Sequence, residues 1–197
     1  MTTEFFNINT FREKLNGGSK ANLFRMDIEL NDDIDGVDLD AANFSVLCKS
    51  GAIPAFTLGV IEVPFRGRRI KIPGDRTYGD WTATFVNDGN QNIRKTFDNW
   101  LKSIVDPDGE EDLRVDSEDT YRSTITVNQL RPDGTVARVY KLYDAFPTDV
   151  SAIDLSYDTT DAIQEFTVTF QYHYLDVGNT SLAGQDASAP DSATATV

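Results

Sequence analysis

Apolar residues alternate with polar ones over several stretches of the chain, and this period of two is typical of half-buried β-strands. In the clearest stretch, residues 165–174, Phe166 begins a series of apolar residues that takes every second position as far as Tyr174. The other predicted strands cover residues 22–30, 43–49, 56–65, 81–86, 121–130, 135–143 and 151–157. The pattern therefore predicts a mainly β protein whose strands bury one face.

Two of these segments carry further signals. Pro64 cannot donate a hydrogen bond to a neighbouring strand, which places residues 56–65 at a sheet edge or Pro64 at a strand end. Arg131-Pro132-Asp133-Gly134 separates two strand-like segments and contains the Asp-Gly pair that favours tight turns. We therefore expect a β-hairpin over residues 121–143.

Two helices are predicted. One covers about residues 90–104, where Asp88 or Asn90 can cap the first turn and the apolar residues fall on one stripe, namely Ile93, Phe97, Trp100, Leu101 and Ile104. The other is short, begins at Asn9 or Thr10 as its cap and ends at Gly17-Gly18. We assign the short helix to an N-terminal arm over residues 1–21.

The remaining segments are predicted to be loops or a tail. Aspartates spaced around Gly36 resemble a calcium-binding loop, but the glycine is not where an EF-hand needs it, so a solvated acidic loop is favoured over residues 32–40. A second acidic loop is expected over residues 106–120. Residues 177–197 form a predicted disordered tail, because the segment after Ala183 has no aromatic residue to bury. One domain over residues 22–176 remains.

Charge and residue usage exclude several classes of function. The net charge is -14, which argues against binding to nucleic acid or to an anionic membrane. The single histidine, His173, and the single cysteine, Cys48, cannot form a zinc site within one chain. His173 lies on the polar face of a predicted strand and is expected to be a surface residue rather than a catalytic base, and Cys48 is expected to be a small buried hydrophobe. No glycine-rich nucleotide motif occurs, so we predict no cofactor and no enzymatic activity.

The chain offers no stretch for membrane insertion. It lacks a run of about 18 uncharged apolar residues, and the segment Met1–Phe6 lacks the basic start of a signal peptide. We expect a soluble protein that is not exported by the usual route.

The densest local signal is the stretch from Gly74 to Trp81. It follows the basic run Arg66–Lys71, and Arg76 lies between Asp75 and Asp80 in the sequence. Glycines beside aspartates favour a shaped loop. Two interpretations stay open: a contact between subunits, or a turn that is closed by its own ion pair.

This stretch, with several others in the same order, resembles the tail tube protein family of T-even-type contractile-tailed bacteriophages. The residues that carry the resemblance are Asn22-Leu23-Phe24, Ile53-Pro54, Arg69-Ile70-Lys71-Ile72, the Gly74–Trp81 stretch, Val86-Asn87-Asp88, Phe97, Trp100, Phe146-Pro147-Thr148-Asp149-Val150 and Gln164-Glu165-Phe166-Thr167-Val168. It covers about residues 22–175. The two acidic segments and the tail depart from the family pattern, so nothing is carried over to them.

The resemblance implies a small antiparallel β-barrel or sandwich with the helix packed outside. It implies a structural role in the virion tail after assembly in the host cytoplasm: hexameric rings that stack head to tail, contact sheath, baseplate and tube-end proteins, and conduct double-stranded DNA without binding it tightly. The candidate subunit contacts are Arg68, Arg69, Arg76, Tyr78, Asp80 and Trp81. We expect a net negative lumen, with the basic run directed to other subunits or the sheath.

Two alternative functions remain open: one shares the fold but differs in what the tube transports, and the other belongs to a different class of protein. The chain could be the tube-like protein of a type VI secretion or phage-derived injection system, which shares the fold. A stand-alone β-sandwich that binds a ligand such as carbohydrate is the other alternative.

Overall fold

The fold was taken from a computed structural model, which describes residues 7–15, 17–30, 41–105, 121–158 and 160–178. The two predicted acidic loops lie outside the described residues, and so does the predicted tail from residue 179 onward. The same is true of the segment that resembled a calcium-binding loop. The start of the tail at residue 177 was wrong, because Val177 and Gly178 belong to a strand and pair with Tyr140 and Val139.

Nine strands and three helices are described. In chain order they are α1 (Ile8–Leu15), β1 (Phe24–Glu29), α2 (Ala41–Leu47), β2 (Cys48–Gly51), β3 (Phe56–Phe65), β4 (Arg68–Tyr78), β5 (Trp81–Val86), α3 (Asn92–Ile104), β6 (Ser123–Leu130), β7 (Val136–Val150), β8 (Glu165–Gln171) and β9 (Tyr174–Gly178). The prediction of a mainly β protein with a packed helix is confirmed.

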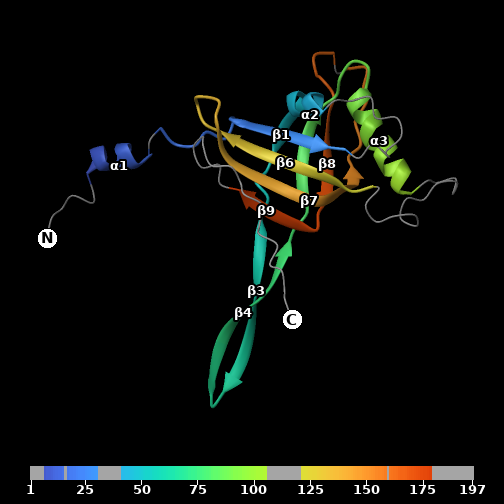
Figure 1. The fold of residues 1–197 in the computed structure, drawn as a ribbon. Helices are drawn as coiled ribbons and strands as arrows, with labels where there is room; N and C mark the ends of the chain where they lie inside the picture. The colour runs from blue at the N-terminus through green and yellow to red at the C-terminus, as the bar shows by residue number, and fades with distance from the viewer. Residues whose placement is uncertain (1–6, 16, 31–40, 106–120, 159, 179–197) are drawn as a thin grey trace, which may run out of the picture.

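The body is an open, sandwich-like arrangement of antiparallel strands in the order β1-β6-β7-β8-β5-β2, with β9 also paired to β7 (Figure 1). Strand β7 belongs to both layers: its first half pairs with β6 and β9, and its second half pairs with β8. Asp144 has a positive φ of 55° between these halves, where the strand changes layer. Within the described residues the sheet does not close into a barrel.

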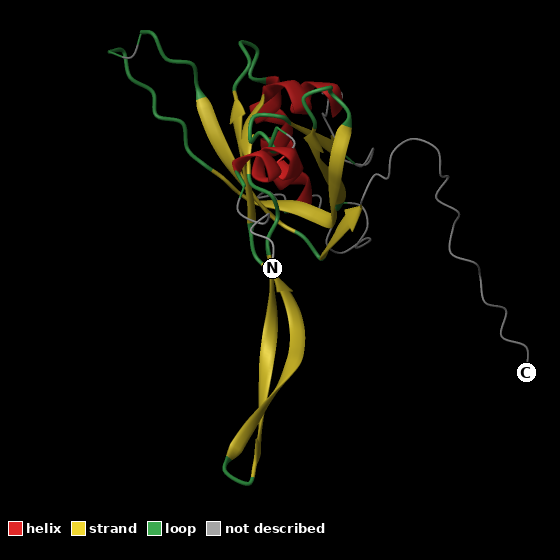
Figure 2. Ribbon diagram, turned by 90° about the vertical axis from the view of Figure 1, so that its left-hand side faces the viewer, coloured by secondary structure: helices red, strands yellow, loops and turns green. Residues whose placement is uncertain are grey.

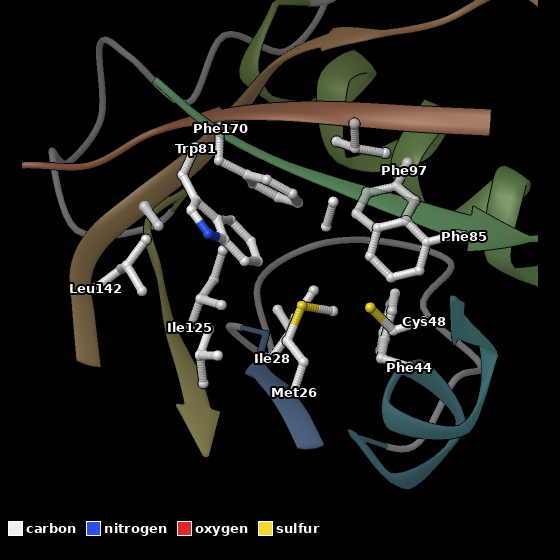
Figure 3. Packing of buried hydrophobic residues seen from close by; sticks show 14 of the residues in the cluster. Met26, Ile28, Phe44, Cys48, Trp81, Phe85, Phe97, Ile125, Leu142 and Phe170 are labelled. Carbon is white, nitrogen blue, oxygen red and sulfur yellow. The ribbon is translucent and has the colours of Figure 1, made fainter. Parts of the chain in front are cut away.

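The core lies between the two layers and beneath α3 (Figure 3). Phe97 is the centre of an aromatic cluster, with ring contacts to Phe44, Phe85, Trp100, Phe166 and Phe170. Such edge-on and stacked ring pairs add to the stabilisation from burial alone. The cluster fixes α3 on the sheets.

The predicted helix over about residues 90–104 is found at Asn92–Ile104, with Ile93, Phe97, Trp100 and Ile104 buried. Asp88 provides the cap, because its Oδ1 accepts the backbone N–H of Ile93 at 3.2 Å. Helix α1 is also present, but its cap is Asn7 rather than Asn9 or Thr10, since Asn7 Oδ1 accepts the N–H of Asn9 at 3.1 Å. No residue of α1 is buried, and the helix stands apart from the sheets (Figure 1).

The strand predicted over residues 43–49 was wrong. Residues 41–47 form helix α2, and of the predicted segment only Cys48 and Lys49 belong to a strand, β2. Phe44 and Cys48, four positions apart, are buried, whereas Val46 between them is 82% exposed. An apolar series this short fits either period, and packing against the core selected the helix.

The strand predicted over residues 151–157 was also wrong, because β7 ends at Val150 and that segment is irregular. Its Ser151 N–H donates to the carbonyl of Thr167 at 2.8 Å, and then the chain leaves the sheet. Both edges of β8 are already paired, with β5 and β7. A segment in which apolar and polar residues alternate forms a strand only where a neighbouring strand has a free edge to pair with it.

The last predicted strand is divided in two at Tyr172-His173, so Tyr174 does not share the buried face of Phe166 as predicted. Tyr174 is 43% exposed and its ring stacks on that of Tyr143, with centroids 4.5 Å apart. The interruption shifts the alternation by one residue. Leu175 is therefore the buried residue of β9.

Candidate assembly interface

Strands β3 and β4 form a two-stranded hairpin that projects away from the body (Figures 1 and 2). Its turn is Arg66-Gly67, and both residues have positive φ, 43° and 81°. This is the conformation of the tight turns that match the twist of a hairpin. The basic run is thus the tip and outgoing strand of an exposed arm.

The strand register divides the hairpin into two faces. Directly opposed residues share a face, and Ile61 is opposite Ile72, Val63 opposite Ile70, and Phe65 opposite Arg68. We call Ile61, Val63, Phe65, Ile70 and Ile72 the apolar face; their exposures lie between 41% and 59%. Such a contiguous exposed apolar surface typically marks an interaction site.

The opposite face of the outer hairpin carries ion pairs. Glu62 lies opposite Lys71 and next to Arg69, with N···O distances of 3.8 Å and 2.9 Å. Exposed pairs of this kind stabilise only weakly, so they orient side chains more than they hold the hairpin together. We call Glu62, Arg69 and Lys71 the charged face.

The base of the hairpin contains an irregularity between Leu58 and Val60. Two glycines meet there: a Cβ on Gly74 would lie 3.3 Å from the carbonyl oxygen of Gly59. Glycine at both positions lets the backbones approach closely where β4 has an extra residue.

The predicted loop at residues 74–81 and its internal ion pair were wrong. Strand β4 continues to Tyr78, so only Gly79 and Asp80 connect it to β5. Arg76 makes no ion pair with Asp75 or Asp80 within the described residues; its guanidinium lies over the ring of Phe56, 4.8 Å from the centroid. Asp80 instead accepts a hydrogen bond from the Gln171 side chain.

The structure separates the six candidate contact residues. Arg68, Arg69 and Arg76 are exposed on the hairpin, whereas Tyr78 packs at its base against Tyr172, with centroids 5.5 Å apart. Trp81 lies in the core, 2% exposed, and its Nε1–H donates to the carbonyl of Ala52 at 2.7 Å. A direct contact of Trp81 with another subunit is therefore not available in this fold.

Sequence reasoning missed the apolar face, because it treated residues 56–65 as one strand of the main sheet. The signal that could have found it is Arg66-Gly67, a two-residue turn with glycine in the second position between two β-rich segments. Apolar residues on an exposed arm and in a half-buried strand give the same alternation.

Chemical sites are not indicated in the part of the chain that the structure describes. No three His, Cys, Asp or Glu side chains gather there in a way that could hold a metal ion. Burial raises the pKa of the Cys48 thiol to about 11, as expected for a buried hydrophobe. Among the described helices, none has the length and apolar character needed to cross a membrane.

Comparison with known proteins decides the family. A sequence profile described as phage tail tube protein matches residues 6–177. This chain belongs to the phage tail tube protein family. The resemblance seen in the sequence and the structural, non-enzymatic role that it implied are confirmed.

Relatives within the family come from several phages. Tail tube protein gp19 of Enterobacteria phage T4 is 34% identical over 132 residues, which span 67% of this chain and 80% of that protein. The corresponding protein of Enterobacteria phage T6 is 35% identical over 133 residues, with the same coverage. A tail tube protein of Serratia phage KSP90 is 28% identical over 120 residues, covering 60% of this chain and 66% of that one.

Solved structures support the tail tube fold. A chain of the sheath-tube complex of an extracellular contractile injection system, PVC, superposes with a TM-score of 0.56 at 15% identity, covering 85% of this chain and 97% of that one. A chain of the anti-feeding prophage baseplate also gives 0.56, at 13% identity, over 81% of this chain and 94% of that one. At these identities the likeness establishes the fold alone.

Proposed function

We propose that this tail tube protein closes into a hexameric ring, and that the rings stack head to tail into the tube of a contractile tail. The observation that carries the proposal is the β3–β4 hairpin, whose apolar face has no partner among the described residues. Apolar side chains on a free arm gain burial only from another molecule. In the proposed assembly that molecule is a neighbouring subunit, which buries the apolar face.

The open edges of the body support ring closure. Among the described strands, β1 pairs only with β6, β2 only with β5, and β9 only with β7. Unpaired edges expose backbone N–H and C=O groups that invite another chain. In the proposed ring the edges of neighbouring subunits pair and form a continuous inner wall.

The hairpin and its base provide the subunit contacts in this proposal. Arg68, Arg69 and Arg76 reach a neighbour directly, while Tyr78 and Asp80 hold the hairpin base against the body through Tyr172 and Gln171. Trp81 acts through its packing beneath the same base.

Charge supports a conduit for double-stranded DNA. The chain carries a net charge of -14, yet five of its 18 Lys and Arg residues lie between Phe56 and Tyr78. A wall lined by cations would bind phosphates and retard the DNA, whereas a net negative lumen repels it. The basic hairpin therefore faces other subunits or the sheath in this proposal, and a structure of the assembled ring would test the sign of the lumen.

The relatives support a proposal for the partners and the location. Similar folds occur in complexes described as sheath-tube complex, baseplate and tube-terminating cap, so we propose contacts with sheath, baseplate and tube-end proteins. A phage tail is favoured over an injection particle, because the phage relatives are 34% and 35% identical and the injection-system chains 15% and 13%. We place the protein in the virion tail after assembly in the host cytoplasm.

Negative-stain electron microscopy of the purified protein tests the proposal. Hollow rods or stacked rings with sixfold end views are expected. Featureless monomers at all concentrations, combined with specific binding of a small ligand, would instead favour a stand-alone binding module.

A further inference from the structure

A second group of exposed apolar side chains lies in the connection between β7 and β8. Leu155, Tyr157 and Ile163 are 79%, 104% and 72% exposed. Three exposed carboxylates lie beside them in the sequence, and none of the three makes an ion pair within the described residues. We call these six residues the loop patch: Asp154, Leu155, Tyr157, Asp158, Asp161 and Ile163.

The loop patch is hollowed rather than flat. A cavity of about 210 Å³ opens beside it, and its lining includes Ile153, Asp154, Leu155 and Ile163. An apolar side chain presented from outside could enter this hollow while a cation beside it met a carboxylate.

The loop patch and the hairpin lie at opposite ends of the molecule. Figure 1 shows the β7–β8 connection above α2 and the hairpin tip far below, and the hairpin also extends below the body in the view turned by 90° (Figure 2). Two different surfaces at opposite ends, if they fit one another, generate an open head-to-tail assembly rather than a closed pair.

The two surfaces have opposite charge. Between Phe56 and Tyr78 there are five cations and two carboxylates, whereas residues 151–164 contain three aspartates and no Lys or Arg. Arg69 and Lys71 already pair with Glu62, and Arg76 lies over Phe56 near the base. At the tip, Arg66 lies over the ring of its neighbour Phe65, 5.6 Å from the centroid. Neither Arg66 nor Arg68 has a carboxylate partner among the described residues, so each can meet one on another molecule.

We propose that the loop patch receives the β3–β4 hairpin of a second copy of this chain in the adjacent ring. Phe65 and the rest of the apolar face lie against Leu155, Tyr157 and Ile163, and Arg66 and Arg68 lie beside the aspartates. The inference rests on the proposed stacking of rings and identifies the surface that receives the hairpin.

Charge reversal with rescue tests this contact. One variant carries Arg66→Glu and Arg68→Glu, and the other carries Asp154→Lys and Asp158→Lys. Each variant alone brings like charges together at every ring-to-ring contact. Because exposed ion pairs change an association constant a few-fold each and are repeated around a ring, the concentration needed for rods should rise at least about tenfold. Rings should persist, since the sheet edges are unchanged.

Mixing the two variants, or combining all four substitutions in one chain, restores opposite charges and should restore rods near the parent's concentration. The combined chain also keeps the parent's net charge of -14, so it controls for bulk charge. Rods from either single variant at the parent's concentration would overturn the inference, and so would loss of rings or a failure of both rescues. A parent protein that forms neither rings nor rods would instead overturn the proposed function.

Discussion

The apolar face of the hairpin should govern assembly without governing folding, and Ile70→Thr with Ile72→Thr tests this directly. These side chains are 53% and 46% exposed in the single chain, so about half of each surface is still available to be buried by a neighbour. Threonine keeps the β-branch that favours an extended strand while it removes apolar surface.

The expected magnitude follows from that remaining surface. Full burial of an isoleucine side chain stabilises by roughly 1.5–3 kcal/mol, so burying the exposed half contributes about 1 kcal/mol per residue. Losing both should weaken each contact by about 2 kcal/mol, which is roughly 30-fold in its association constant. The free energy of unfolding of a subunit should change by less than about 1 kcal/mol, since neither side chain belongs to the core.

Sedimentation velocity over a concentration series measures assembly, and far-ultraviolet circular dichroism measures folding. Val46→Thr is the matched control, because Val46 is 82% exposed on α2 and outside the hairpin. The control should assemble like the parent. A folded Ile70→Thr/Ile72→Thr protein that assembles at the parent's concentration would refute the assignment of the apolar face to a subunit contact.

Three further outcomes are expected. Trp81→Ala should destabilise the fold itself by about 3–5 kcal/mol, because it leaves a core cavity and an unpaired Ala52 carbonyl; a urea midpoint equal to the parent's would contradict the packing. Burial raises the pKa of the Cys48 thiol from 9.0 to about 11, so between these pH values the folded state retains a proton that the unfolded state loses. The free energy of unfolding, relative to that of Cys48→Ala, should therefore fall by up to about 3 kcal/mol between pH 9 and 11. If the free-energy difference between the two proteins did not change with pH, Cys48 would not be buried as described. Truncation after Leu182 should leave soluble, assembling protein, since the deleted segment has little apolar surface to bury, and loss of assembly on sedimentation would show that it docks.

Part of the candidate interface was predictable from local sequence, and part was not. Residue types alone left two interpretations of the Gly74–Trp81 stretch, a subunit contact or a turn closed by its own ion pair, and the contact remains a prediction. The ion pair suggested for Arg76 with Asp75 or Asp80 was wrong, since the Arg76 guanidinium lies over the ring of Phe56. In an extended strand Asp75, the residue before Arg76, points to the opposite face, and Asp80 is four residues further along, roughly 13 Å away.

The sequence by itself determined the β-rich class, the α3 stripe, the Arg131–Gly134 hairpin and the family, because each depends on a period or motif of a few residues. Only the tertiary structure decided that residues 43–47 are helical, that residues 151–157 have no strand partner, and that Trp81 faces the core. The physical reason is common to all three. The sequence pattern indicates which positions are apolar, but the free sheet edges and the space in the core decide which of those positions become buried and in which element. The hairpin shows the limit most clearly, since its apolar residues alternate as in a core strand and remain exposed in the single chain.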